Sequence, residues 1–98
     1  MRADKPDGNT AAIVEELRAR GYIVEYAKGM PFDLLVIGHS RITGMTACVL
    51  VECKAPGGRF TPNEIHFQAA LVDRSYQGIY IVATTISDIT IVFGDTGL

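Results

Sequence analysis

The sequence is poor in cysteine, has no surplus of positive charge and contains no long apolar run. No segment approaches the roughly 20 apolar residues that a membrane-spanning helix needs. The first eight residues also lack the apolar centre of a signal peptide. These absences lead us to expect a cytoplasmic protein with no part in a membrane.

The only two cysteines, Cys48 and Cys53, lie in one apolar run of the sequence. Strand positions an odd number apart point to opposite faces, so these two thiols are not expected to pair with each other. Two thiols also do not make a zinc site without histidines, and His39 and His66 lie in unrelated contexts. We therefore expect two buried, reduced cysteines.

The charge balance bears on the class of partner. Nine Lys and Arg residues against 11 Asp and Glu residues give a net charge of −2. Proteins that neutralise many phosphates usually carry a surplus of Lys and Arg. The balance weakens a nucleic-acid hypothesis without excluding it, because a nuclease site concentrates carboxylates to bind metal.

Length and patterning predict a single α/β domain over residues 1–98. Residues 1–8 are expected to be flexible, and Asn9 or Thr10 is expected to cap the first helix. The predicted order is αβββαββ, with a mixed sheet flanked by two helices. The predicted helices cover residues 9–20 and 62–76, and the predicted strands cover residues 22–27, 33–38, 46–54, 79–83 and 89–93. The first helix is expected to stop at Gly21, and the second to begin with a capping box at Thr61 and Glu64.

Three ionisable residues stand at strand ends in this pattern. Asp33 opens one strand, and Glu52 and Lys54 close the next, sharing a face because they are two positions apart. If these strands are antiparallel neighbours, Asp33 lies beside Glu52. Two carboxylates suit a hard divalent cation, and a lysine beside it can orient water or stabilise charge on a phosphate. A plain solvated charge pair is the alternative for Glu52 and Lys54, but the apolar run before them makes it the weaker one.

These residues resemble the signature of the PD-(D/E)XK nucleases. Pro31-Phe32-Asp33 followed by Glu52-Cys53-Lys54 carries the resemblance, and residues 51–62 are similar to the VRR-NUC branch. That branch includes small phage and bacterial proteins, and several relatives act on branched DNA such as Holliday junctions. The resemblance implies a restriction-endonuclease-like core and a bacterial or phage-infected host cytoplasm.

The resemblance also implies residue roles. Asp33 and Glu52 would hold Mg²⁺ or Mn²⁺ with the backbone carbonyl of Cys53, and Lys54 would serve the attacking water. Glu64 or Gln68 would supply a polar contact from the second helix. A glutamate that relatives often carry early in the first helix is expected to be absent here, or replaced by Asp7. Glu15 and Glu16 are expected on a solvated face of that helix.

Other residues leave two interpretations open. Arg59 and Lys28 could each contact a DNA phosphate or be solvated loop residues. His66 is more easily explained as a surface or packing residue of the second helix. Six aromatic residues are expected in the core or a dimer interface rather than in a base-stacking platform. They are Tyr22, Tyr26, Phe67, Tyr76, Tyr80 and Phe93.

The sequence therefore predicts a metal-dependent DNA endonuclease, structure-selective for branched DNA such as a Holliday junction, and a homodimer. A homodimer would suit symmetric incision of a four-way junction. Two alternatives remain open. The chain could be an inactive nuclease-fold module that binds DNA or protein, or a nuclease subunit that needs a larger partner.

Overall fold

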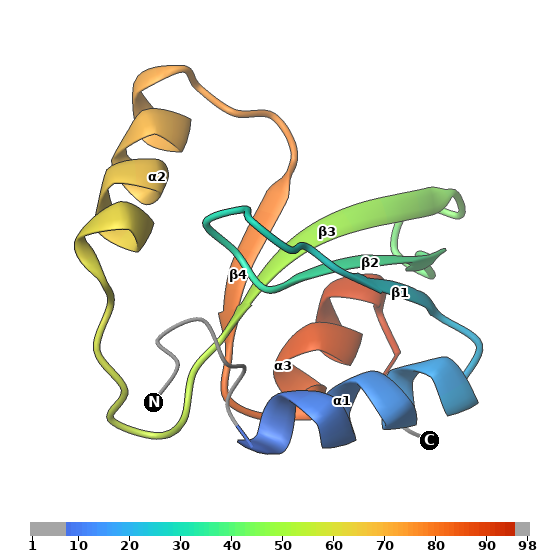
Figure 1. The fold of residues 1–98 in the computed structure, drawn as a ribbon. Helices are drawn as coiled ribbons and strands as arrows, with labels where there is room; N and C mark the ends of the chain where they lie inside the picture. The colour runs from blue at the N-terminus through green and yellow to red at the C-terminus, as the bar shows by residue number, and fades with distance from the viewer. Residues whose placement is uncertain (1–7, 96–98) are drawn as a thin grey trace.

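The computed structural model describes residues 8–95 and shows an α/β domain with a four-stranded mixed sheet and three helices (Figure 1). The expected flexibility of the first residues and the suggested role of Asp7 lie outside the described residues, except that Gly8 already belongs to the first helix. The elements in order are α1 (Gly8–Ala19), β1 (Ile23–Tyr26), β2 (Leu34–His39), β3 (Thr46–Cys53), α2 (Pro62–Asp73), β4 (Ile79–Ala83), α3 (Ile86–Thr90) and the 3₁₀ turn η1 (Ile91–Phe93).

The sheet has the spatial order β1-β2-β3-β4. The first two pairs are antiparallel, and Leu34 of β2 lies opposite Val51 of β3. β4 runs parallel to β3, with Ala83 opposite Cys53, because the connection through α2 returns the chain to the edge of the sheet at which β3 begins. β2 and β3 are therefore antiparallel neighbours, which is the condition under which Asp33 lies beside Glu52.

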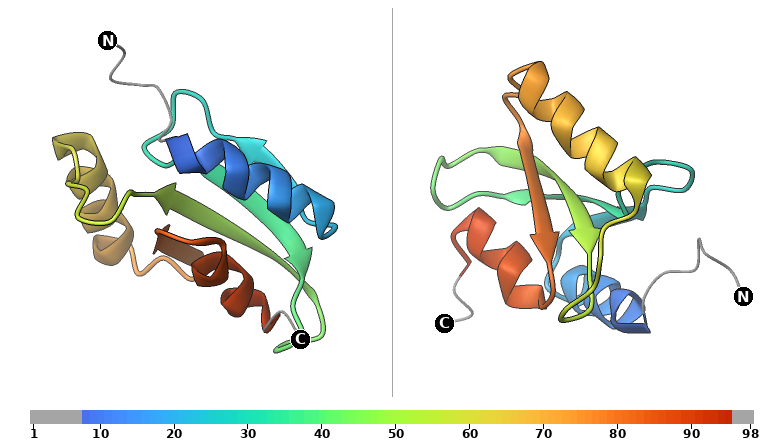
Figure 2. Two further views of the ribbon diagram at one scale, coloured as in Figure 1. Left: turned by 90° about the horizontal axis from the view of Figure 1, so that it is seen from below. Right: turned by 90° about the vertical axis from the view of Figure 1, so that its left-hand side faces the viewer.

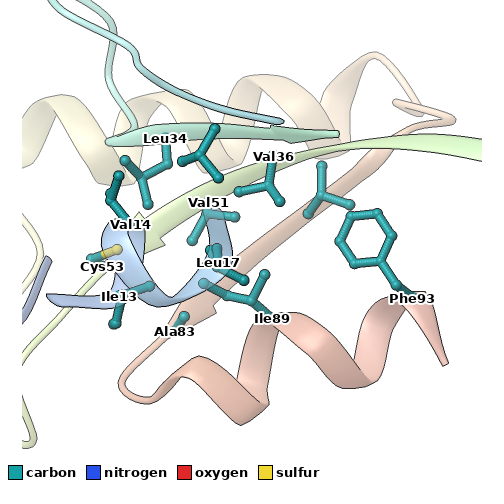
Figure 3. Close-up of a cluster of buried hydrophobic side chains, with 12 residues drawn as sticks. Ile13, Val14, Leu17, Leu34, Val36, Val51, Cys53, Ala83, Ile89 and Phe93 are labelled. Carbon is teal, nitrogen blue, oxygen red and sulfur yellow. The ribbon is translucent and has the colours of Figure 1, made fainter. Parts of the chain in front are cut away.

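The core lies between one face of the sheet and the helices α1 and α3, which run side by side across it (Figure 2). Alternate strand residues such as Val49 and Val51 point into this layer, where Leu17 and Ile89 meet them with no exposed surface. Figure 3 shows how these side chains from helix and strand converge. One sheet face is therefore fully committed to packing.

The two ends of α1 differ in how well they were predicted. The capping role expected of Asn9 or Thr10 is wrong, because both lie within the helix. The Asn9 amide instead donates to the carbonyl of Thr84 (3.0 Å), and Thr10 is buried. Gly21 does stop the helix, with φ of 97° and the paired hydrogen bonds of a Schellman motif behind it.

The opposite face of the sheet carries α2, which buries none of its residues (Figure 2). Its predicted capping box is confirmed, since Thr61 and Glu64 exchange backbone and side-chain hydrogen bonds with Pro62 between them. The helix ends at Asp73, before the predicted Tyr76, because Ser75 adopts a left-handed φ of 51°. No helix within residues 8–95 has both the length and the apolar character to cross a bilayer.

The cysteines lie on opposite faces of β3, as their spacing requires. Cys53 is buried in the core, but Cys48 is exposed, so its expected burial is wrong. Even-numbered β3 residues face the side of α2, and α2 covers only part of that side (Figure 1). An apolar run alone does not distinguish a strand that is covered on both faces from one that is covered on one.

The predicted last strand, residues 89–93, is also wrong. The chain forms α3 and η1 there, so the sheet is flanked by three helices instead of two. The Asp88 carboxylate accepts hydrogen bonds from the N–H groups of Thr84 and Thr85 and so starts α3. The helical period then buries Ile89 and Phe93 and leaves Ile91 63% exposed.

This geometry predicts a contrast between two substitutions. Phe93→Ala removes a side chain that is fully buried and packs edge-on against Tyr22, so it should lower the free energy of unfolding by about 3–5 kcal/mol. Ile91→Ala should change it by less than about 0.5 kcal/mol. Urea denaturation measures both. Comparable losses for the two variants would indicate the strand, in which residues 89, 91 and 93 share one face.

Candidate active site

Asp33 is held at the end of β3 by one backbone hydrogen bond, which continues the pairing of β2 and β3, and by one hydrogen bond of its carboxylate. Its N–H donates to the carbonyl of Val51 (2.9 Å), and its Oδ2 accepts the N–H of Cys53 (2.8 Å). This second bond fixes the Asp33 carboxylate against the peptide that follows Glu52. The expected proximity of the two carboxylates follows from this register, and the Asp33 charge acts on Glu52.

Glu52 is only 2% exposed, although it lies on the sheet face that α2 only partly covers. Its Oε2 lies 3.4 Å from Nζ of Lys54, while Oε1 has no hydrogen-bond partner within residues 8–95. Burial, a hydrogen bond to Glu64 and the charge of Asp33 raise the pKa of Glu52 to about 8. In the absence of a cation, this carboxyl therefore holds a proton at neutral pH.

Lys54 and Glu64 form the second half of the ionic cluster. Nζ of Lys54 lies 2.8 Å from Oε1 of Glu64, which also accepts the N–H of Thr61 at the start of α2. Burial alone would lower the pKa of Lys54, but the carboxylates of Glu64 and Glu52 raise it overall. Burial likewise opposes ionisation of Glu64, but hydrogen bonds from Lys54, Glu52 and Thr61 lower its pKa. At neutral pH, Lys54 is therefore protonated and Glu64 is ionised.

Glu64 and Gln68, the two residues of α2 predicted as polar contacts of the site, have different partners in the structure. Glu64 joins the ionic cluster, whereas the amide of Gln68 donates to the hydroxyl of Tyr80 (3.0 Å). Gln68 faces a second hollow, which lies between α2 and β4. Of the two, Glu64 is therefore the one beside the carboxylates.

Aromatic rings connect this site to α2, a feature that the sequence did not reveal. Phe32 stacks on Phe67 of α2, with 5.7 Å between ring centroids, and Phe67 meets Tyr80 edge-on at the same separation. Burial raises the pKa of the Tyr80 hydroxyl, and the charges of the nearby carboxylates add to that rise. Tyr80 lies opposite Leu50 and so shares the face of Glu52, a placement that depends on the β3–β4 register. No local signal in the sequence carries that register.

The four residues of the ionic cluster, Asp33, Glu52, Lys54 and Glu64, line a cavity of about 730 Å³ between the β1–β2 loop, the end of β3 and α2. Lys28 and His66 are exposed and line this cavity, whereas Arg59 is exposed in the loop before α2 and is not part of the lining. The sequence-predicted residues that line the cavity are Lys28, Asp33, Glu52, Cys53, Lys54, Glu64 and His66. Gln68 and Arg59 are the two candidates that the fold does not bring there.

The donor set fits a hard divalent cation. Asp33 and Glu52 present carboxylate oxygens side by side, and Oε1 of Glu52 is a buried oxygen that a cation could satisfy. No group of three His, Cys, Asp or Glu side chains that could hold a metal occurs in the described part of the chain. An ion here would therefore rest on two carboxylates and the Cys53 carbonyl, completed by water and phosphate, as Mg²⁺ sites commonly are.

The first helix adds no acidic side chain to the cavity within residues 8–19. Glu15 and Glu16 are exposed, and Glu16 pairs with Arg20 on the surface (3.0 Å), as expected for a solvated helix face.

Glu52→Gln should stabilise the metal-free fold increasingly as the pH rises. Because its folded pKa is raised from 4.5 to about 8, Glu52 contributes stability that is present in full below 4.5 and is lost as the pH rises to about 8. Glutamine has the same shape and no charge to bury. Melting temperatures in EDTA should therefore show a larger advantage of Glu52→Gln above pH 8 than below pH 5. An equal difference at both pH values, or the same trend in the surface control Glu15→Gln, would contradict a buried neutral carboxyl.

Comparisons with known proteins leave the function to be argued from this geometry. None of the family models, curated proteins or solved structures that were compared with the chain matches it. The cluster of Asp33, Glu52, Lys54 and Glu64 and the cavity beside it are therefore the basis for a functional assignment.

Proposed function

We propose that this protein is a metal-dependent nuclease that hydrolyses phosphodiester bonds in DNA. The observation that carries the proposal is the burial of Glu52 beside Asp33 and Lys54 at the ends of paired strands. Burying a carboxyl in a folded domain costs free energy, and such costs are concentrated at functional sites. A cation that neutralises this carboxyl would remove much of that cost.

The fold supports the same proposal at the level of arrangement. A helix, three antiparallel strands, a second helix and a fourth strand parallel to the third form the sequence of elements here. This is the arrangement that the resemblance to the PD-(D/E)XK nucleases leads us to expect. We propose that the four-stranded sheet is a restriction-endonuclease-like core with α3 and η1 added after it.

Each residue of the cluster has a separate task in the proposed reaction. Asp33 and Glu52 would hold Mg²⁺ or Mn²⁺ with the Cys53 carbonyl; such an ion polarises a phosphate and lowers the pKa of water. Lys54, kept as an ammonium, donates hydrogen bonds to the attacking water or to phosphate oxygens that gain charge. The raised pKa of Lys54 makes it unsuited to act as a base at neutral pH.

Glu64 positions Lys54 before a substrate arrives. Its carboxylate is held by the N–H of Thr61 and therefore by the first turn of α2, so the ammonium is fixed relative to the sheet. A phosphate that enters the cavity would compete with Glu64 for the donors of Lys54. Lys54 would therefore have a hydrogen-bond acceptor, and a fixed orientation, both with and without a bound phosphate.

We extend the proposal to a structure-selective homodimer. α2 presents Val72 to solvent with 77% of its surface exposed, and Ile65 and Tyr76 are also exposed. Val72 and Tyr76 border the hollow of about 400 Å³ between α2 and β4. A second copy that covers this face would bury these side chains and place two active sites on one junction.

Cleavage of branched DNA tests the proposal. Purified protein should cut labelled four-way junctions and flaps in Mg²⁺ or Mn²⁺. Lys54→Ala and Asp33→Asn should each lower the rate roughly 100-fold or more, because each removes a charge that acts on the scissile phosphate. Asp73→Asn, which changes an exposed carboxylate at the end of α2, and Arg20→Ala are matched controls that should cleave normally.

The outcomes separate the alternatives. No cleavage of any DNA in either metal would refute an active nuclease in the isolated chain and favour a binding module or a subunit that needs a partner. Full activity in Lys54→Ala would refute the site. Light scattering of the same preparation should give twice the 10.6 kDa mass of the chain.

A further inference from the structure

Helix α2 buries none of its residues, so polar and aromatic contacts hold it beside the sheet. Glu64 in its first turn pairs with Lys54 at the end of β3 (2.8 Å). One turn later, Phe67 contacts two rings outside the helix, and Gln68 donates to the hydroxyl of Tyr80 (3.0 Å). Glu64, Phe67 and Gln68 share one helix face, since positions three and four apart are neighbours on a helix. The ionic and the aromatic contacts of α2 therefore come from the same face.

Phe67 joins the helix that carries Glu64 to the segment that carries Asp33. Its ring stacks on that of Phe32, with an angle of 24° between the ring planes, and Phe32 is only 8% exposed. Phe32 directly precedes Asp33, whose carboxylate accepts the N–H of Cys53 (2.8 Å). The ring that Phe67 contacts is therefore attached to the same end of the sheet as the Asp33 carboxylate.

The aromatic contacts restrict the orientation of α2 in a way that the ion pair alone does not. A lysine and a glutamate have several rotatable bonds each, so their ion pair permits many positions of the two backbones. Phe67 is stacked on Phe32 and lies edge-on to Tyr80 at 75°, and these two ring angles limit how the helix can turn. A phosphate that displaces Glu64 from Lys54 would leave these uncharged contacts in place.

We propose that Phe67 is a positioning residue of the site, which holds Glu64 against Lys54 through its contacts with Phe32 and Tyr80. The effect on DNA cleavage rests on the proposed nuclease function, whereas the effect on the ion pair does not. Phe67 also lines the cavity. A direct contact with a nucleotide would be a different role, in which Phe67 would change substrate binding without acting through Glu64.

The side-chain ammonium of Lys54 reports the ion pair with neither metal nor DNA present. The chain has three lysines, so ¹⁵N-labelled lysine gives few ammonium signals in an NMR spectrum in EDTA, and loss in Lys54→Arg identifies the signal. Phe67→Ala should move this signal to its position in Glu64→Gln, which keeps the capping box of α2 without the charge. Phe67→Tyr, which keeps the ring, should leave the signal in place. Val72→Ala shortens an exposed side chain of the same helix and, as the matched control, should also leave it in place.

The cleavage rates of these variants distinguish positioning from contact with the substrate. Phe67→Ala should lower kcat roughly tenfold and leave KM unchanged, because a small displacement of a catalytic group is enough to slow a reaction. The effects of residues that act through one another do not add, so Phe67→Ala should cause no further loss in a protein that already carries Glu64→Gln. A raised KM, or equal losses in the two backgrounds, would overturn positioning through Glu64.

Failure of this inference and failure of the proposed function give different results. A Lys54 signal that stays in place in Phe67→Ala would overturn the inference, whatever the cleavage rate. A moved signal in a protein that cuts no DNA in Mg²⁺ or Mn²⁺ would support the positioning and refute hydrolysis. If Phe67→Ala does not fold, as loss of the amide signals of α1 and α3 would show, Phe67→Leu is the second variant. It keeps apolar volume without a ring and should move the Lys54 signal in the same direction.

Discussion

The antiparallel register of β2 and β3 is the constraint on which the site depends. Leu34 lies opposite Val51, so Asp33, the residue before Leu34, lies against the end of β3. Its carboxylate there accepts the N–H of Cys53. A slip of one position would turn Glu52 into the core layer and Cys53 out of it. The apolar positions on the core face prevent that slip, because Val36, Val49 and Val51 are fully buried only in the observed register. The core and the site are therefore specified by the same pairing.

Charge balance around Glu52 explains how the fold tolerates this cluster. Three carboxyls and one ammonium lie close together. A protonated Glu52 beside an ionised Glu64 and a protonated Lys54 leaves less uncompensated charge in this cluster than three ionised carboxyls would. Glu64 belongs to the first turn of α2, so a helix that buries no residue of its own is tied to the sheet through this ion pair and through the Phe67 contacts. Electrostatics and aromatic packing thus replace the hydrophobic docking that α1 and α3 have.

The sequence predicted the parts of this molecule that depend on local patterns. Strand period placed Glu52 and Lys54 together, the Thr61 and Glu64 pair marked the start of α2, and Gly21 marked the end of α1. The predicted strand over residues 89–93 is wrong because an apolar run fits both the strand and the helix period, and the hydrogen bonds that Asp88 accepts from Thr84 and Thr85 start a helix there. Tyr80 could not be assigned to the site in advance, because its place on the face of Glu52 depends on the register of β3 and β4. The roles of Asp33, Glu52 and Lys54 in catalysis remain predictions.

The central claim is that Asp33 and Glu52 bind one divalent cation, and calorimetric titration with Mn²⁺ tests it most directly. The account predicts that wild-type protein and the surface variant Asp73→Asn bind one ion per chain, and that Glu52→Gln loses this binding because a neutral amide replaces the buried carboxylate. Binding should also release a proton near neutral pH, since Glu52 must ionise to become a ligand. Absence of Mn²⁺ binding in the wild type, or unchanged binding in Glu52→Gln, would contradict the account.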